Sequence, residues 1–268
     1  MKTKIGAVVL IILLIGLINA FPEGFNDKIG VVEKLGNKIP LNVSFTDSDG
    51  KTVVLKDLIN KPTVIDLAYY KCTGICTPLM TEVANVINKV DLQAGKDYNI
   101  VTISINDNEF TKDAAAKKAE MMNLVKSDIP ANAWSFLTGD SSAIKTVTNA
   151  VGFYYQPQKE TFIHTGVLIF VSADGKICRY LKPDYDSHGN FKVLPFDFKM
   201  ALLEASKGEA IPVIDNVVRY CFSYQPQSDT YTFDLFKIFG TGTLLIVAVV
   251  FVFVVLKPGK HNKKIHSA

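Results

Sequence analysis

Short runs rich in β-branched residues alternate with segments of helical spacing through the middle of the chain. The β-rich runs cover residues 63–70, 98–105, 134–137, 165–172 and 176–181, and helical spacing covers 78–90, 111–125, 142–151 and 198–205. Such alternation is typical of a sheet with parallel strands and with helices on both faces. The last two β-rich runs follow each other directly and are expected to add an antiparallel edge. The sequence therefore predicts an α/β sandwich.

A β-hairpin is predicted in front of this sandwich, over residues 44–55. Asp49 and Gly50 form a dipeptide typical of hairpin turns, and Ser44-Phe-Thr precedes them while Thr52-Val-Val-Leu55 follows. We therefore expect an N-terminal β-hairpin extension of the sheet.

Two uncharged apolar stretches, residues 5–22 and 238–256, bracket this central region. Lys2 and Lys4 precede the first stretch, a layout typical of a secretory signal, so residues 1–20 are predicted to be a signal peptide or an N-terminal anchor. The second stretch has about the 20 residues that span a hydrocarbon core of ~30 Å. We therefore expect a C-terminal transmembrane helix that anchors the chain in the lipid bilayer.

Lysines flank both stretches on their terminal sides, which predicts that both tails are cytoplasmic. Residues 257–268 would form a cytoplasmic basic tail, 208–237 a tether, and 33–207 a domain in the periplasm or on the outer face of the cytoplasmic membrane. Such a compartment permits disulfides. Without the six terminal lysines, 23 basic residues face 26 acidic ones, so the net charge of +3 belongs to the tails. A nucleic-acid partner is not expected, because no basic stripe is present.

Two cysteines follow the first β-rich run, in the sequence Cys72-Thr-Gly-Ile-Cys76. A helix is predicted to begin beside them, and the positive end of its dipole favours thiolate. Such a pair can close a disulfide or bind a soft metal.

His164 lies just before a later β-rich run. The loop after the first core strand and the loop before a later one can face each other at one end of a sheet, which would place the imidazole over Cys72 and Cys76. Two thiolates and an imidazole suit Cu(I), and the imidazole also accommodates Cu(II). Zinc with the same ligands and a water is chemically possible.

These motifs and their order resemble the Sco/SenC family, which comprises thioredoxin-like, membrane-tethered copper proteins linked to cytochrome c oxidase assembly. The resemblance covers roughly residues 44–231. It is carried by Tyr70-Lys-Cys-Thr-Gly-Ile-Cys76, Ser104-Ile-Asn leading into 112–118, Trp134-Ser-Phe-Leu-Thr-Gly-Asp140, Phe162-Ile-His-Thr-Gly166 and the later Asp174-Gly-Lys. The resemblance implies a thioredoxin-like copper-binding domain over 33–207 with Cys72, Cys76 and His164 as the copper ligands. It implies, as partner, a cytochrome c oxidase subunit that carries a copper centre.

The chain departs from the family pattern at three positions. Family members often have proline directly after each motif cysteine, whereas this chain has Thr73 and Thr77. The acidic residue of the family's Ser-Ile-Asp is Asn106 here, so an acidic helper at that point is not expected. Ordinary thioredoxin-like reductases have a shorter Cys-x₂-Cys spacing and a proline just before the later strand. This chain has neither the shorter cysteine spacing nor that proline, which argues against routine disulfide exchange.

The other sulfur and imidazole groups are assigned simpler roles. Cys178 is expected to be a core thiol, and Cys221 to pack between aromatic residues, to pair with Cys178, or to act as a third redox thiol. His188 is expected to lie in an exposed turn, and His261 and His266 to be solvated tail residues. Met121 and Met122 are expected to pack in a helix.

Three functions remain open on the sequence. The first is a membrane-anchored, extracytoplasmic copper metallochaperone for a cytochrome c oxidase copper centre, which is not an enzyme in the turnover sense. The second is a thiol–disulfide oxidoreductase that acts on cysteines of an oxidase subunit, in which Cys72 attacks and Cys76 resolves. The third is a redox or copper sensor. His164 favours the first, because simple thiol exchange does not need an imidazole.

Overall fold

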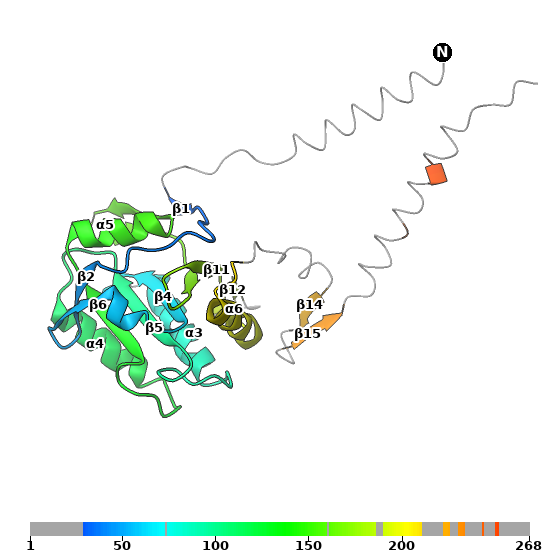
Figure 1. Ribbon diagram of the computed structural model, residues 1–268, viewed down its shortest axis with the longest axis horizontal. Coiled ribbons are helices and arrows are strands. Elements are labelled where there is room, and N and C mark those ends of the chain that lie inside the picture. The colour runs from blue at the N-terminus through cyan, green and yellow to red at the C-terminus, as the bar shows by residue number, and fades with distance from the viewer. Residues whose placement is uncertain are drawn as a thin grey trace, which may run out of the picture. The chain divides into compact units, whose positions relative to one another are not determined.

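The computed structural model describes residues 29–72, 74–159, 161–185 and 190–210, the strands at 222–225 and 230–233, and residues 243, 250 and 251. The chain divides into two units, Asn26–Ile214 and a second that combines Met1–Phe25 with Asp215–Ala268. The first unit contains the sheet and the helices around it (Figure 1). The three predicted copper ligands also lie within this unit.

A seven-stranded mixed sheet lies at the centre of the first unit, in the order β11-β10-β4-β5-β6-β2-β3. Its strands are β2 (Ser44–Asp47), β3 (Thr52–Val54), β4 (Thr63–Ala68), β5 (Asn99–Ser104), β6 (Trp134–Thr138), β10 (Leu168–Val171) and β11 (Ile177–Leu181). Strands β4, β5 and β6 are parallel, and the pairs at both edges are antiparallel. Every residue of β4 is buried, which is typical of a central strand covered on both faces.

Helices cover both faces of this sheet. They are α2 (Leu55–Leu58), α3 (Cys76–Ile87), α4 (Thr111–Met122), α5 (Ser141–Ala150) and α6 (Pro195–Lys207). The crossovers through α3 and α4 step along the sheet in the same direction, so right-handed connections place both helices on one face, where they contact each other. Helix α5 lies on the other side of the sheet (Figure 1). Helix α6 packs on β4, β10 and β11.

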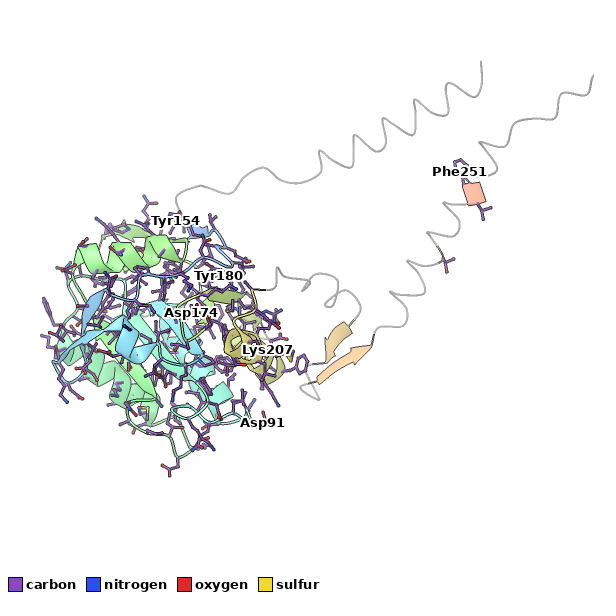
Figure 2. The ribbon with its side chains drawn as sticks, in the orientation of Figure 1. Asp91, Tyr154, Asp174, Tyr180, Lys207 and Phe251 are labelled. Atoms are coloured by element: carbon purple, nitrogen blue, oxygen red, sulfur yellow. The ribbon has the colours of Figure 1, made fainter. Side chains whose placement is uncertain are left out.

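The apolar spacing of α3 explains its place in the fold. Leu79, Val83 and Ile87 are buried on one side of this helix, because residues four apart lie on the same face. After α3 comes the exposed loop residue Asp91 (Figure 2). It pairs with Lys199 of α6 at 2.7 Å. This ion pair links the loop after α3 to α6.

Several short strand pairs were not predicted. They are β1 (Gly30–Val31) with β7 (Phe153–Tyr154), β8 (Gln156–Gln158) with β9 (Thr161–Ile163), β12 (Asp184–Tyr185) with β13 (Phe191–Lys192), and β14 (Phe222–Gln225) with β15 (Thr230–Phe233). The last pair lies within the segment 208–237 that we expected to be a tether without a regular pattern. Runs of two to four residues carry too little periodicity to be recognised from sequence.

The structure confirms the α/β sandwich, its N-terminal hairpin and its antiparallel edge. Strands β2 and β3 pair as expected, and Gly50 in the turn between them has a φ of +80°, which favours glycine. The predicted strand at 165–172 begins only at Leu168. Residues 165–167 form a loop instead, and this loop follows His164.

The predicted C-terminal transmembrane helix is wrong, and the fold class is corrected at this point. Within the part of the chain that the structure describes, no helix is long and apolar enough to cross a membrane, which takes about 20 residues. Of residues 238–256, only Thr243, Val250 and Phe251 are described, and the rest of that segment lies outside the described residues. The fold class is therefore an α/β sandwich with an N-terminal β-hairpin and no assigned transmembrane helix.

Other expectations fall on residues that the structure does not describe. These are the signal peptide or anchor at 1–20, the basic tail at 257–268, and the side chains of His188, Cys221, His261 and His266. They stay predictions.

Candidate metal centre

The loop between β4 and α3 places Cys72 against the start of the helix. The Sγ atom of Cys72 accepts hydrogen bonds from the backbone N–H groups of Gly74 at 3.3 Å and Cys76 at 3.4 Å. The N-cap residue, Ile75, makes no side-chain cap, so this sulfur takes the place of a capping oxygen at the helix start. Hydrogen bonds to the sulfur and the positive helix end both favour the thiolate form of Cys72.

The structure brings His164 onto Cys76, which is the first residue of α3. The Nε2 atom of His164 lies 3.0 Å from the Sγ atom of Cys76, and its Nδ1 atom lies 3.0 Å from the carbonyl oxygen of Thr165. A carbonyl oxygen can only accept, so Nδ1 carries the proton in that contact. The other ring nitrogen, Nε2, therefore faces the sulfur of Cys76.

The two thiols are ionised unequally. A hydrogen bond from the thiol of Cys76 lowers the pKa of Cys72 far below its ordinary value, against the opposing effect of burial. The same contact with Cys72, followed by burial, raises the pKa of Cys76. Cys72 is 7% and Cys76 2% exposed. The pair therefore holds one proton between two sulfurs, with the negative charge on the more accessible Cys72.

Aromatic rings confine the imidazole of His164. The ring of Tyr69 lies 6.0 Å and that of Phe153 5.9 Å from it, and Phe162 packs edge-on against Tyr69 at 5.3 Å. Burial, and after it a hydrogen bond with Cys72, raises the pKa of Tyr69 to about 12. Tyr69 was not singled out from the sequence, where it is the second-last residue of the β-rich run 63–70.

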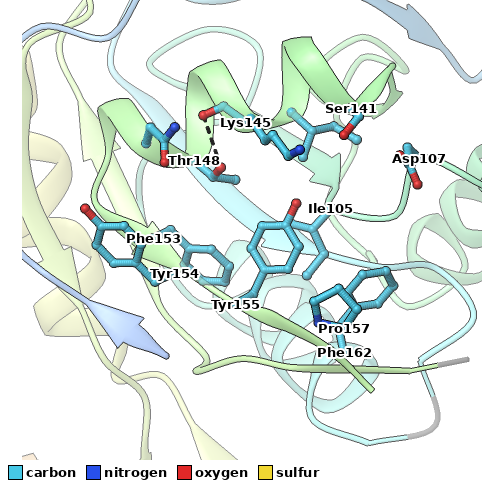
Figure 3. Close-up of a pocket in the computed structure, with 12 residues that line it drawn as sticks. Ile105, Asp107, Ser141, Lys145, Thr148, Phe153, Tyr154, Tyr155, Pro157 and Phe162 are labelled. Atoms are coloured by element: carbon cyan, nitrogen blue, oxygen red, sulfur yellow. Dashed lines mark hydrogen bonds between the residues drawn. The ribbon is translucent and has the colours of Figure 1, made fainter. Parts of the chain in front are cut away.

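A cavity of about 380 Å³ has two of these rings, those of Phe153 and Phe162, in its wall. It is lined by Ile105, Asp107, Ser141, Ile144, Lys145, Thr148, Asn149, Phe153, Tyr154, Tyr155, Pro157 and Phe162. In Figure 3, Lys145 of α5 lies on one side of the ring of Tyr155 and Phe162 on the other. Phe153 and Phe162 thus belong to both the surroundings of His164 and the wall of the cavity.

A buried carboxyl group of β4 interacts electrostatically with the same imidazole. Asp66 is 1% exposed, and its Oδ2 accepts a hydrogen bond of 3.4 Å from Thr102, whose Oγ1 accepts one of 2.9 Å from Trp134 Nε1. The Oδ1 atom of Asp66 has no partner among the described residues. Burial raises the pKa of Asp66 to about 7, and the charge of His164 acts against that rise. An acidic residue inside an apolar strand was the only signal for it in the sequence.

Thr77, which stands where the family often has proline, connects the cysteine loop to α4. Its hydroxyl donates to the carbonyl oxygen of Cys72 at 3.2 Å and accepts from Nζ of Lys117 at 3.1 Å. Lys117 also pairs with Glu120 at 2.7 Å. The departure from the family pattern thus comes with a specific polar contact.

The three predicted ligands do not yet surround a common point. Among the described residues, no three His, Cys, Asp or Glu side chains are arranged to hold a metal ion. The Sγ atom of Cys76 contacts His164 directly. The Sγ atom of Cys72 instead accepts a hydrogen bond from the backbone N–H of Cys76. Cys178, by contrast, is a fully buried free thiol that donates to the carbonyl oxygen of Lys176, which fits the expected core role.

Comparison with known proteins identifies the family. The family model described as SCO1/SenC matches residues 34–193. No curated protein matches the chain. Among solved structures, a proposed electron transfer protein from Aquifex aeolicus VF5 is 22% identical with a TM-score of 0.57, and the match covers 66% of this chain and 96% of that protein.

Two further structures are similar. A proposed electron transport protein from the same organism is 22% identical with a TM-score of 0.53, over 65% of this chain and 99% of that one. Arabidopsis thaliana ScoI with copper bound is 21% identical with a TM-score of 0.49, over 63% of this chain and 98% of that one. Structural likeness at such low identity bears on the fold alone. The family model covers more than half of the sequence, and the chain therefore belongs to the SCO1/SenC family.

Proposed function

We propose that this domain is a copper metallochaperone. It holds copper on Cys72, Cys76 and His164 and passes it to the copper centre of a cytochrome c oxidase subunit. Membership of the SCO1/SenC family supports the oxidase as recipient. The observation that carries the ligand assignment is the 3.0 Å contact between His164 Nε2 and Cys76 Sγ, with Nδ1 of the ring turned to a carbonyl oxygen. A ring held through one nitrogen presents the other for metal binding.

The donor set suits copper. Two sulfurs and one imidazole nitrogen favour Cu(I) by softness, and the nitrogen also serves Cu(II). Metal–sulfur and metal–nitrogen bonds of about 2.3 and 2.0 Å separate two donors by more than 3.0 Å. The direct contact between Cys76 and His164 therefore opens when copper enters, and its re-formation favours release to an acceptor.

We also propose that the domain works outside the cytoplasm. The basic and then apolar sequence of residues 1–20 supports this location. An oxidising compartment would allow a reversible disulfide between Cys72 and Cys76 to compete with copper binding.

The deciding experiment measures copper stoichiometry and affinity for the wild type and for His164→Ala. We expect Cu(I) affinity to fall only partly in the variant, because two thiolates can hold Cu(I) by themselves. Cu(II) binding should be lost or spectrally changed, because Cu(II) prefers nitrogen and oxygen donors. His164→Ala with unchanged binding of both copper states would remove His164 from the site, and a wild type that binds no copper would end the proposal.

The lowered pKa of Cys72 favours a second candidate, thiol–disulfide exchange. The Cys72 thiolate would attack a substrate disulfide and release one substrate thiolate. Cys76 would then displace the second, so that the substrate gains two electrons and the chain forms the Cys72–Cys76 disulfide. This activity should survive His164→Ala largely intact. If the variant keeps normal Cu(II) binding and wild-type reductase activity, the second candidate replaces the first.

A further inference from the structure

Glu109 is a buried carboxylate beneath the loop that carries Cys72. It is 2% exposed and lies between β5 and α4. Its Oε2 atom accepts hydrogen bonds from the backbone N–H of Tyr70 and from the hydroxyl of Ser104, both at 2.7 Å. Its Oε1 atom accepts from the backbone N–H of Lys71 at 2.8 Å. Both carboxylate oxygens are therefore used, and two of their three donors belong to the cysteine loop.

The two N–H groups that Glu109 binds belong to the middle of a turn. The N–H of Cys72 donates to the carbonyl oxygen of Tyr69 at 3.3 Å, which makes Tyr70 and Lys71 the central residues of a four-residue turn. Their N–H groups point away from the turn's own hydrogen bond and need other acceptors once buried. Glu109 supplies both, so one side chain fixes the backbone immediately before Cys72.

We propose that Glu109 is a positioning residue for the copper site, which it serves by holding this turn so that the Cys72 sulfur stays on the N–H groups of Gly74 and Cys76. This inference rests on the proposed function and adds a residue to it. The sequence offered no acidic helper at the family's position, because Asn106 stands there. The structure supplies a carboxylate three residues later.

Ser104 fixes the orientation of the Glu109 carboxylate. Its hydroxyl donates to Oε2 of Glu109 and also accepts from the N–H of Asn106 at 3.1 Å. The end of β5 thus orients the carboxylate, and the carboxylate orients the loop after β4. An amide in place of Glu109 would turn an NH₂ group toward one of these donors, which costs a hydrogen bond and leaves a buried donor unsatisfied.

The test compares Glu109→Gln with the wild type in the full chain. We expect Cu(I) affinity to fall about 10–100-fold, the range for loss of a group that orients a metal ligand. The sulfur-to-Cu(II) charge-transfer band should shift, because the position of Cys72 changes. Hydrogen exchange at the amides of Tyr70 and Lys71 should quicken in the copper-free protein. This last readout does not depend on copper, so it separates failure of this inference from failure of the proposed function.

The matched control is Glu204→Gln. Glu204 is a carboxylate of similar burial, 8% exposed, and it pairs with Arg179 at 3.1 Å on α6 and β11. The Glu204→Gln variant should have a lower unfolding midpoint than the wild type and an unchanged copper spectrum. Glu109→Asp keeps the acceptor oxygens on a shorter side chain and should restore part of the affinity; it also serves if Glu109→Gln does not fold. A Glu109 variant that loses stability like the control, yet keeps wild-type copper affinity, spectrum and amide exchange, would overturn the proposal.

Discussion

Cys76→Ser is expected to abolish tight Cu(I) binding. A neutral hydroxyl is a harder and weaker donor than a thiolate, so one sulfur and one imidazole would remain for a soft ion. The loss should exceed the roughly 10–100-fold cost of removing a group that only orients a ligand. Cys72→Ser should behave in the same way. Competition against a Cu(I) chelator of known affinity measures both variants.

Cys178→Ser provides the control for these two variants. Cys178 is also a buried free thiol, but it lies in β11 and bonds a backbone carbonyl rather than His164. Its replacement should leave Cu(I) affinity unchanged. If Cys76→Ser instead retains wild-type affinity while Cys178→Ser loses it, the copper site lies elsewhere in the chain.

The order of the main elements was predictable because periodicity is a local property. The buried β4, with apolar residues on both faces, and α3, with its apolar residues four apart, show their type within a single window of sequence. The approach of His164 to Cys76 was also predictable, since both lie at the same end of neighbouring strands, β4 and β10. Family membership then followed from the order of the motifs.

The groups that hold the site in place were not predictable. Glu109 looks like any acidic loop residue until the chain folds and brings the turn at Tyr70 onto it. The link from Thr77 to Lys117 joins residues 40 positions apart on two helices. Such contacts depend on tertiary structure, which no local pattern encodes. The prediction of a transmembrane helix was wrong for another reason. Hydropathy indicated an apolar stretch long enough to span a bilayer, but no helix among the described residues is long and apolar enough to do so.

Asp66→Asn is expected to stabilise the copper-free protein at pH 8 and to have little effect near pH 4. Burial raises the pKa of Asp66 to about 7 from its ordinary value of 3.8. The folded state therefore binds this proton more tightly than the unfolded state does. Its contribution to stability is fully present below pH 3.8 and is lost as the pH rises through about 7. The difference between these two pKa values corresponds to at most about 4 kcal/mol. Asparagine does not ionise, so the variant escapes this loss.

The measurement is the difference in unfolding free energy between variant and wild type from pH 4 to pH 8, because the other carboxyl groups cancel in that difference. Asp174→Asn is the control, because its difference from wild type should stay constant across this range and change, with the opposite sign, only below it. Asp174 is an exposed residue (Figure 2) whose pKa the hydrogen bond from Lys38 lowers to about 2, so its contribution is present above pH 3.8 and fades as the pH falls toward 2. The advantage of Asp66→Asn over wild type should therefore grow with pH. A constant difference across the range would show that Asp66 ionises at the same pH in the folded and unfolded chain, and a difference that shrinks with pH would show that its carboxylate is stabilised in the core.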